Sequence, residues 1–369
     1  MLYNEIKHVV DKFEFQGEYA SIEEIGSGNV NFTYKLVYTD GDKEHLYVLQ
    51  SLNKVAFQNP EGLMENIGRV IEHISDKLDK NDPDYDRRLL RFIKVKSDGS
   101  YLFRDKNGTC WRAYVFVDGV TAHNYIDSPE LFYEAGRGFG EFQKNLADFP
   151  AEILHETIKN FHNTKRRFYD FVAAIAEDRS GRAKEAEKEI DFIFEHRKMM
   201  NEIVDKLESG ELPIRVTHND TKLNNVLIDD KTGQAICVID LDTVMPGSSL
   251  YDYGDAIRYG ASTAAEDERD LSKVSVDMEL FKLFTKGFIE ETADVLDKHE
   301  MHLFPLGIKV LTCELAMRFL TDFINGDEYF KVESPHHNLR RARAQIKLLT
   351  EIEARFDEMT AYVDALIGY

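Results

Sequence analysis

The residues best suited to chemistry are three acids and one amide near the middle of the chain. Asp220 is followed five positions later by Asn225, and Asp240 and Asp242 close a later apolar run. Phosphoryl transfer requires a carboxylate that orients and deprotonates the acceptor hydroxyl, and hard oxygen ligands that hold Mg²⁺ against the phosphates. The pattern therefore predicts phosphoryl transfer, with Asp220 as the catalytic residue and with Asn225 and Asp240 as metal ligands.

Two short apolar runs should position these groups. Residues 226–228 and 235–239 are typical of β-strands, and a turn that contains Gly233 separates them, which predicts a hairpin. Pairing of the strands should bring Asn225 and Asp240 close together. The alternative is a surface loop with chance acids and an ordinary hairpin, and four oxygen-bearing side chains at its open ends disfavour it.

The same spacing occurs in the protein-kinase pattern H-R-D-x-x-x-x-N, where the metal-binding aspartate of D-F-G also follows a hairpin. Here His218 opens the triplet that ends on Asp220, and residues 239–242 stand in the place of D-F-G. Lys222 is close enough in sequence to reach a phosphate. A protein kinase is disfavoured, because no A-P-E sequence and no recognisable activation loop follow.

The N-terminal part reads as the beginning of a kinase small lobe. Strand-forming runs at residues 21–25, 32–38 and 45–52 surround a stretch with two glycines, whose backbone amides could approach phosphate oxygens closely. An ordinary turn is the alternative for this stretch. The residues expected to bind nucleotide here are Gly26, Gly28 and Asn29.

Gln50 holds the place on the third strand where a kinase small lobe carries a lysine. Glutamine can donate a hydrogen bond but is uncharged, so the phosphate charge must be neutralised by Mg²⁺, Lys222 or Lys54. The adenine should pair with backbone between Tyr114 and Val117, where the end of a buried strand is the alternative.

A strongly apolar helix is predicted over residues 306–324. Glu314, Arg318 and Asp322 recur along it every four residues and form one polar stripe. Such a stripe is commonly an ion-pair ladder within the helix. The functional alternative is that the two acids aim Arg318 at a substrate oxygen. His162, further upstream, is more readily explained as a structural histidine.

The chain resembles the superfamily of aminoglycoside phosphotransferases and choline kinases, and within it the N-acetylhexosamine 1-kinases. The likeness covers nearly the whole chain and is most specific in the C-terminal half. The stretches that carry it are GSGNVNFTY, RVTHNDTKLNN, VIDLDTVMPGSSLYDYGDAIRYGAST, CELAMRFL and HNLRRARAQIKL.

This resemblance implies an α+β, two-lobed protein-kinase-like fold. A small mixed lobe with an antiparallel sheet is expected over residues 1–118, and a larger, mainly helical lobe over 119–369. The resemblance also implies ATP and Mg²⁺ as cofactors, and an N-acetylhexosamine that is phosphorylated at its anomeric hydroxyl. The residues implied to bind that acceptor are Asp242, Thr243, Arg318 and Tyr329.

Support for the catalytic loop is expected from His218 and from Asp255. By resemblance Asp255 accepts hydrogen bonds from the backbone of that loop. Asp252 and Asp255 lie three positions apart on a predicted helix and share a face. The alternative to this supporting role is that the two acids only stabilise the N-terminus of their helix through its dipole.

Composition limits the partners. The chain has 46 Lys and Arg against 67 Asp and Glu, a net charge of −21, which argues against nucleic acid or an anionic membrane. Cys110, Cys237 and Cys313 lack a metal-binding spacing and should be reduced thiols. No signal peptide and no apolar run of roughly 18 residues is apparent. We expect a cytoplasmic protein, acting as a monomer on a small-molecule sugar.

Two other functions remain open. Another small-molecule kinase of the superfamily would act on an aminoglycoside or choline, but a cationic acceptor needs a cleft lined with acids, and Arg318 would repel it. A nucleotide-binding pseudokinase would act as an interaction module. Gln50 is its only support, and the presence of Asp220, Asn225 and Asp240 argues against it.

Overall fold

The computed structural model describes residues 2–25, 31–54 and 56–369, so the predicted nucleotide-binding residues Gly26, Gly28 and Asn29 lie outside the described residues. The chain divides into two compact units. The N-terminal unit comprises Met1–Thr121, Leu154–Ile158 and Leu227–Val244, and the helical unit comprises Ala122–Ile153, Lys159–Val226 and Met245–Tyr369. The predicted division at residue 118 left the two later segments out of the N-terminal unit.

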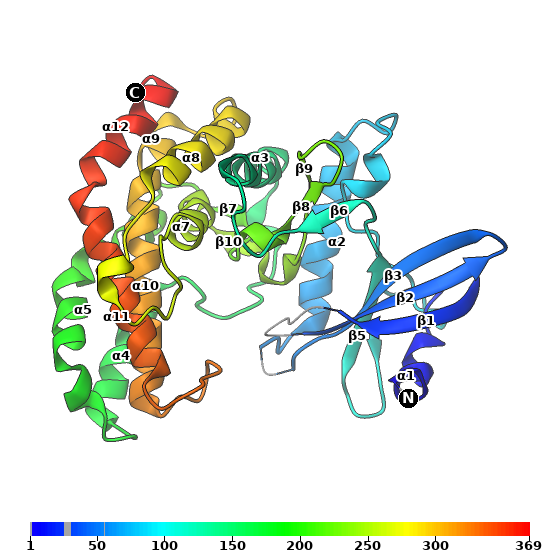
Figure 1. Ribbon diagram of the computed structural model, residues 1–369, viewed down its shortest axis with the longest axis horizontal. Coiled ribbons are helices and arrows are strands. Elements are labelled where there is room, and N and C mark those ends of the chain that lie inside the picture. Colours follow the sequence, from blue (N-terminus) through cyan, green and yellow to red (C-terminus); the bar gives the residue numbers. More distant parts are fainter. Residues whose placement is uncertain (1, 26–30, 55) are drawn as a thin grey trace. The chain divides into compact units, whose positions relative to one another are not determined.

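An antiparallel sheet forms the centre of the N-terminal unit, with strand order β1-β2-β3-β5-β4 (Figure 1). Its strands are β1 (Glu18–Glu24), β2 (Phe32–Asp40), β3 (Lys43–Ser51), β4 (Phe103–Arg104) and β5 (Cys110–Val115). Alternate side chains of β2 are buried, as expected for a strand with one covered face. Tyr34, Leu36 and Tyr38 pack with Val9 and Trp111 in one hydrophobic cluster.

Helices flank this sheet within the same unit. They are α1 (Leu2–Val10), α2 (Pro60–Lys77) and the short η1 (Tyr85–Arg87). Asn59 caps α2 by accepting a hydrogen bond from the backbone N–H of Gly62, and Pro60 occupies the first helical position, where its missing N–H costs nothing. The sequence signals at the start of α2 are therefore those of an ordinary helix.

The predicted hairpin is present. β8 (Val226–Asp229) and β9 (Ala235–Val238) pair, with β6 (Val120–Ala122) on the other side of β8. The turn is held by Asp229, whose Oδ1 accepts hydrogen bonds from the backbone N–H groups of Lys231 and Thr232. Gly233 has a φ of 71°, which a side chain would strain. The hairpin leads into the short helix η5 (Leu241–Thr243).

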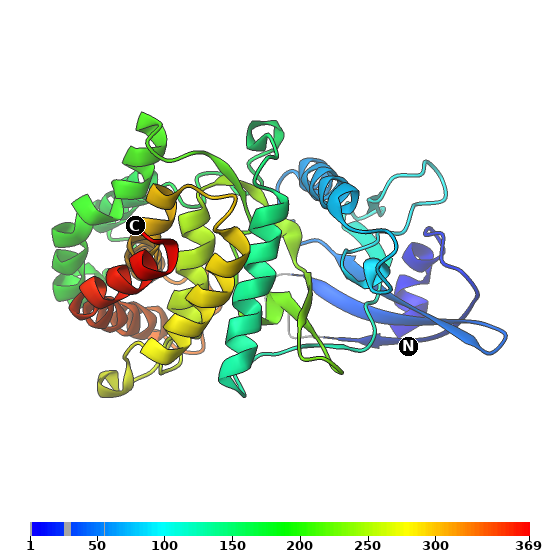
Figure 2. The ribbon, with the colours of Figure 1, turned by 90° about the horizontal axis from the view of Figure 1, so that it is seen from above.

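The helical unit is built around α10 (Phe304–Asn325), which packs against α4 (Thr164–Glu177), α5 (Glu187–Met200), α7 (Ser249–Gly260) and α11 (His337–Ala354). Figures 1 and 2 both show α3 (Pro129–Asn145) beside α8 (Met278–Thr292). These two helices approach closely because Gly136 has no Cβ; an added one would lie 2.3 Å from the carbonyl oxygen of Phe284. The remaining helices are η2 (Ala151–Ile153), η3 (Ala183–Ala186), α6 (Glu202–Ser209), η6 (Leu271–Lys273), α9 (Lys298–His302) and α12 (Phe356–Ile367).

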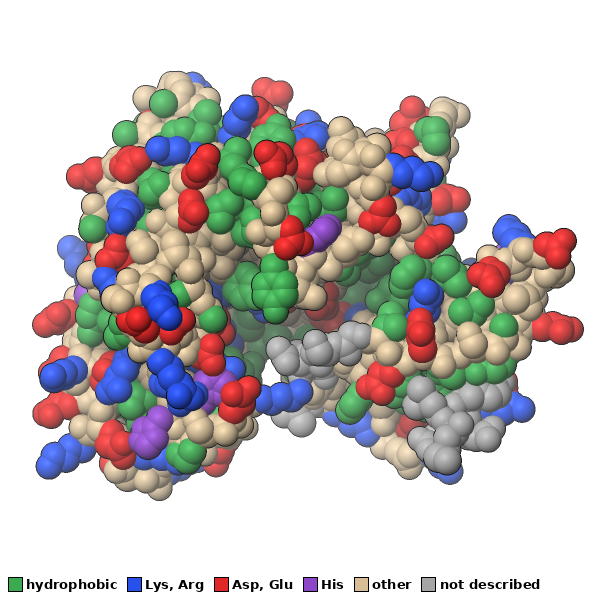
Figure 3. Space-filling view, viewed as in Figure 1, with side chains coloured by type: hydrophobic (Ala, Val, Ile, Leu, Met, Phe, Trp, Pro, Cys, Tyr) green, Lys and Arg blue, Asp and Glu red, His purple; other side chains and the backbone are tan. Residues whose placement is uncertain are grey.

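The predicted α+β class, with a mixed antiparallel-sheet part followed by a mainly helical part, is confirmed. The three cysteines are buried free thiols, as expected. Among the described residues, no helix is both long and apolar enough to cross a membrane. Acidic and basic side chains are interspersed over the face of the molecule in Figure 3, in keeping with acids that are spread along the chain.

Candidate active site

The predicted catalytic loop, which begins at His218, follows strand β7 (Arg215–Thr217), and β7 pairs with β10 (Met245–Gly247) in the helical unit. Thr217 lies opposite Met245 and also donates a side-chain hydrogen bond to its carbonyl oxygen at 3.0 Å. The chain then turns at Asn219, whose φ of 64° is left-handed. Asparagine is among the residues that tolerate this conformation best. The loop therefore begins from a fixed strand end and reverses within two residues.

Asp252, at the start of α7, fixes this loop. Its carboxylate accepts hydrogen bonds from the backbone N–H of His218 at 2.8 Å and from that of Asn219 at 2.7 Å. Gln143 of α3 donates to it at 2.6 Å, and the hydroxyl of Thr221 donates to its backbone carbonyl at 2.6 Å. Burial raises the pKa of Asp252 despite these donors.

The expected role of Asp255 as this brace is corrected by the structure, because the backbone N–H groups of the loop donate to Asp252, one turn earlier. Asp255 instead binds Arg258, with Oδ1 accepting from Nη2 at 2.7 Å. Burial alone would raise the pKa of Asp255, but Arg258 and Lys222 outweigh it and lower that pKa. The two acids share a helix face, yet Asp252 is the one near the first turn, where the loop backbone arrives.

His218 is positioned by aromatic rings of α3. Its ring lies 5.6 Å from that of Phe139 and 5.8 Å from that of Phe142, both edge-on, and its side chain is fully buried. Nδ1 of His218 accepts a hydrogen bond from the backbone N–H of Asp220 at 3.3 Å. The packing and this contact are compatible with the predicted supporting role.

Asp220 lies on this loop and keeps 28% of its side chain accessible. Its Oδ1 lies 2.6 Å from Nζ of Lys222, and its Oδ2 accepts a hydrogen bond from Nδ2 of Asn225 at 3.0 Å. The same amide nitrogen donates to the backbone carbonyl of Asp220 at 2.8 Å. The carboxylate is thus held from two sides while part of it stays open to a substrate.

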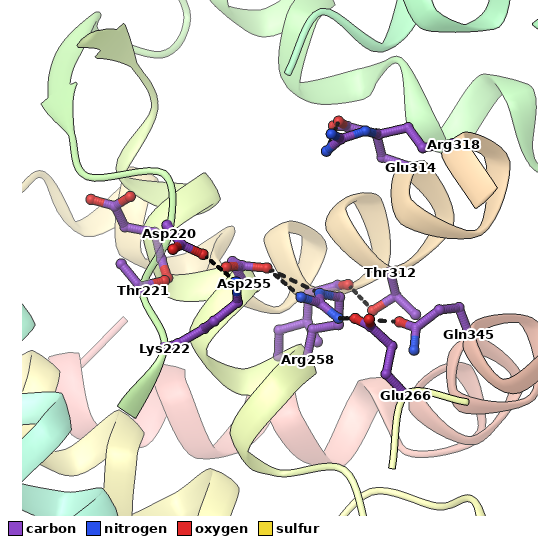
Figure 4. Close-up of polar contacts among 12 residues, drawn as sticks. Asp220, Thr221, Lys222, Asp255, Arg258, Glu266, Thr312, Glu314, Arg318 and Gln345 are labelled. Carbon is purple, nitrogen blue, oxygen red and sulfur yellow. Dashed lines mark hydrogen bonds and ion pairs between the residues drawn. The ribbon is translucent and has the colours of Figure 1, made fainter. Parts of the chain in front are cut away.

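A chain of alternating charges runs from this carboxylate through the helical unit (Figure 4). Lys222 lies between Asp220 and Asp255, and Arg258 lies between Asp255 and Glu266. Burial by itself would lower the pKa of Lys222, but the carboxylates of Asp220 and Asp255 raise it. Lys222 therefore stays protonated at neutral pH, as a phosphate-binding role would require.

Arg318 belongs to a second cluster of side chains, on α10. Its guanidinium faces the rings of Phe161 at 5.2 Å and of Tyr329 at 5.9 Å. Its ion pair with Glu314 is long, at 3.9 Å, because Glu314 lies closer to Nδ1 of His162, at 3.0 Å. Figure 4 shows Arg318 extending from α10. Arg318 is therefore weakly paired, unlike a member of a tight ladder.

Asp322 is not the second acid that aims Arg318. Its carboxylate accepts hydrogen bonds from the backbone N–H groups of Tyr329 at 2.8 Å and Phe330 at 2.9 Å. It thereby fixes the segment after α10 that carries Tyr329, a residue that is 65% exposed. The predicted acceptor residues Arg318 and Tyr329 do lie close together. Asp322 contributes to this by holding the backbone of Tyr329, and not by pairing with Arg318.

Arg167 of α4 is a member of this cluster that sequence reasoning missed. Burial, and then the positive charge of nearby Arg318, lower its pKa. Its Nε donates to the carbonyl oxygen of Phe161 at 3.3 Å. No motif marks it, because it lies inside an ordinary amphipathic helix, and only the packing of α4 on α10 reveals it.

The other predicted acids lie in the N-terminal unit. Asp240 follows β9 and has a left-handed φ of 58°. Asp242 is 2% exposed, and both of its oxygens have partners: Oδ1 binds Nη1 of Arg112, and Oδ2 accepts a hydrogen bond from Asn31 at 2.8 Å. Thr243 is half-buried at the end of η5.

The predicted adenine-binding stretch follows β5. Tyr114 is in the strand and Val117 lies just beyond it, before β6. Burial raises the pKa of Tyr114. Arg87 holds the backbone after this stretch, since it donates to the carbonyl of Gly119 at 3.0 Å and pairs with Asp229 at 2.6 Å. Arg87, in turn, keeps the pKa of Asp229 well below its usual range.

The described part of the chain contains no group of three or more His, Cys, Asp and Glu side chains that could hold a metal. The predicted set, Asn225 and Asp240, is an amide and a carboxylate, the hard oxygen donors that suit Mg²⁺ when phosphates complete its coordination. Asn225 fits this role in orientation, because its nitrogen is used by Asp220 and its oxygen is the atom left to bind a cation.

Known proteins match this chain in sequence pattern and in fold. A family model described as the phosphotransferase enzyme family matches residues 21–274, more than two-thirds of the chain. Among solved structures, a microcompartment-associated aminopropanol kinase superposes with a TM-score of 0.65 at 16% identity over 97% of this chain and 98% of that one. Choline kinase from Cryptosporidium parvum Iowa II superposes with a TM-score of 0.60 at 13% identity, over 100% of both chains.

A spectinomycin phosphotransferase in complex with ADP and spectinomycin gives a TM-score of 0.56 at 12% identity, over 96% of this chain and 98% of that one. At such identities these structures show a shared fold.

Proposed function

Because the chain belongs to the phosphotransferase enzyme family, we propose that it transfers the γ-phosphoryl group of ATP to the anomeric hydroxyl of an N-acetylhexosamine and so forms the sugar 1-phosphate. The observation that carries the class of acceptor is the pair of arginines, Arg318 and Arg167, whose nearby buried acids are engaged by other groups. The resemblance of the sequence to hexosamine kinases supports the particular sugar and the reacting hydroxyl.

The charges around Arg318 suit a neutral acceptor that is rich in oxygen. Arg318 and Arg167 are two cations, and the buried acids nearby are engaged elsewhere: Glu314 is shared with His162, and Asp322 accepts hydrogen bonds from the backbone after α10. A cationic acceptor such as choline or an aminoglycoside would be repelled there. A sugar offers hydroxyl and N-acetyl oxygens to the guanidinium donors and an apolar face to the ring of Tyr329.

Asp220 is the catalytic residue of this proposal. It accepts the proton of the sugar hydroxyl, whose oxygen forms a bond to the γ-phosphorus. The bond between that phosphorus and the β–γ bridging oxygen breaks, and ADP leaves with the electron pair. Lys222 and Asn225 orient the carboxylate through the contacts that they make with its two oxygens.

When bound, Mg²⁺ would neutralise charge on the phosphates. Asn225 and Asp240 are proposed as its protein ligands, and Thr243 as a further acceptor contact. Both oxygens of Asp242 are already engaged, by Arg112 and by Asn31. The residues proposed to contact the nucleotide are Gly26, Gly28, Asn29, Gln50, Tyr114, Val117 and Lys222.

A panel of acceptors tests the proposal. ADP release is measured with ATP and Mg²⁺ against N-acetylglucosamine, N-acetylgalactosamine, plain hexoses, choline and kanamycin. Activity should be confined to the N-acetylated sugars and should be absent from an Asp220→Asn preparation, which controls for contaminating kinases. Faster turnover with choline or kanamycin than with either N-acetylated sugar would refute the assignment of the acceptor.

A further inference from the structure

The lysine that kinase-like folds place on the third strand normally pairs with a glutamate of the following helix, and both must be in position for catalysis. Here the strand offers Gln50, which cannot form that ion pair. Gln50 lies directly opposite Arg112 in the register of β3 and β5. The positive charge at this level of the sheet is therefore present, but on the neighbouring strand.

Arg112 joins Gln50 to the loop after β9. Its Nε and Nη2 both donate to Oε1 of Gln50, at 3.0 and 2.9 Å, and its Nη1 binds Oδ1 of Asp242. The amide of Gln50 is fixed in this orientation because its nitrogen donates to the hydroxyl of Thr33 at 3.1 Å. The side chains of Arg112 and Asp242 are each only 3% exposed.

The same carboxylate also binds the start of β2. Oδ2 of Asp242 accepts from Asn31 at 2.8 Å, and the oxygen of that amide accepts from the backbone N–H of Asn53 at 3.0 Å. Helix α2 reaches this loop through a neutral amide, since Asn66 donates to the carbonyl of Val244 at 2.9 Å. Glu65, its neighbour on α2, pairs with His155 instead.

We propose that Arg112 is a positioning residue that replaces the usual lysine–glutamate pair and fixes the loop bearing Asp240 to the nucleotide-binding sheet. Asp242 is then the anchor of that loop and makes no contact with the acceptor. A neutral glutamine at position 50 suits this arrangement, because a lysine there would place a second cation against the guanidinium of Arg112. This inference rests on the proposed metal role of Asp240 and is independent of the sugar.

Arg112→Met tests it by calorimetry, with a non-hydrolysable ATP analogue titrated at several Mg²⁺ concentrations and no acceptor present. Loss of a side chain that supports a metal ligand typically weakens metal binding by about 10- to 100-fold, and we expect a loss of that size in the Mg²⁺ dependence. Arg104→Met is the matched control, since Arg104 lies on β4 of the same sheet and forms an exposed ion pair with Glu61 of α2, and it should leave the titration unchanged.

Two further variants separate positioning from general stability. Arg112→Lys keeps the charge but loses the planar fork, so it should fold and still bind Mg²⁺ and analogue several-fold more weakly. Gln50→Lys should weaken binding in the wild-type background and should recover binding in the Arg112→Met background. Wild-type Mg²⁺ dependence in Arg112→Lys and in any folded Arg112→Met protein would overturn the proposal, whichever acceptor the enzyme uses.

Discussion

The clusters around Arg112 and Arg318 use the same chemical group in opposite ways. Arg112 is 3% exposed, and its guanidinium donates to Gln50 and pairs with Asp242 on two other elements. Arg318 is 14% exposed, its ion pair with Glu314 is 3.9 Å long, and aromatic rings cover its faces. A guanidinium whose donors are used by neighbouring elements holds those elements together. One with donors to spare can bind a ligand.

The loop that carries Asp220 contains both kinds of group, one fully engaged and one partly open. Its backbone is fixed by buried Asp252, whereas the carboxylate of Asp220 remains partly open. Substitutions at fully engaged groups should therefore disturb metal binding and stability together. Changes at open groups should alter catalysis or acceptor binding and leave the fold intact.

The largest effect is expected for Asp220→Asn, which keeps the shape of the open carboxylate but removes the proton acceptor. General-base groups typically contribute a factor of about 10²–10⁴, so kcat should fall by at least about 100-fold. The melting temperature and the affinity for an ATP analogue should change little. Steady-state kinetics and calorimetry on the same preparation measure all three quantities. Near wild-type turnover would remove Asp220 from the catalytic role.

Arg318→Ala should have the next largest effect. A hydrogen bond to a charged group contributes roughly 1.5–3 kcal/mol, so the KM for the sugar should rise by about 10- to 150-fold while the KM for ATP changes little. Arg318→Lys keeps the charge and loses the fork, and a sugar-binding arginine should not tolerate it. Unchanged sugar kinetics in both variants would show that Arg318 does not bind the sugar and serves only in ion pairing within α10.

The surface ladder of α11 is the matched control and should show the smallest effect. Glu351 accepts hydrogen bonds from Lys347 and Arg355 at i−4 and i+4, and these lower its pKa to about 2. Arg355→Ala should leave both KM values unchanged. Such a partly exposed pair contributes at most about 1 kcal/mol to the free energy of unfolding. A clear rise in the KM for the sugar would mean that the Arg318 result is not specific.

The pH dependence of this ladder follows from the sign of the shift. The pKa of Glu351 is lower in the folded protein than its ordinary 4.5, so its contribution is complete above about pH 4.5 and disappears as the pH falls toward 2. Denaturant titrations of wild type and Glu351→Gln should therefore differ slightly at pH 7 and converge near pH 2. A difference that grows on acidification would contradict this assignment.

Local sequence patterns predicted the helices and strands that depend mainly on neighbouring residues. The hairpin and its Gly233 turn, the first three strands of the N-terminal sheet and the apolar helix α10 all follow from periodicity and turn chemistry. The pairing of Asn225 with Asp220 also follows from a short spacing.

Features that depend on packing between distant segments were not predictable. Asp252 and Asp255 share a helix face, and only the arrival of the loop backbone decides which of them braces it. Arg112 lies 130 residues from Asp242, and no pattern within either segment indicates their contact. Arg167 similarly gains its neighbour Arg318 only when α4 packs on α10.

We propose that the anomeric hydroxyl of an N-acetylhexosamine receives the phosphoryl group. Phosphorus NMR of the product formed from N-acetylglucosamine, ATP and Mg²⁺ tests it most directly. One new phosphate signal that is coupled to the anomeric proton is expected, and it should be absent when Asp220→Asn is used. A phosphate coupled to the protons at carbon 6, or ADP release with no phosphorylated sugar, would contradict it.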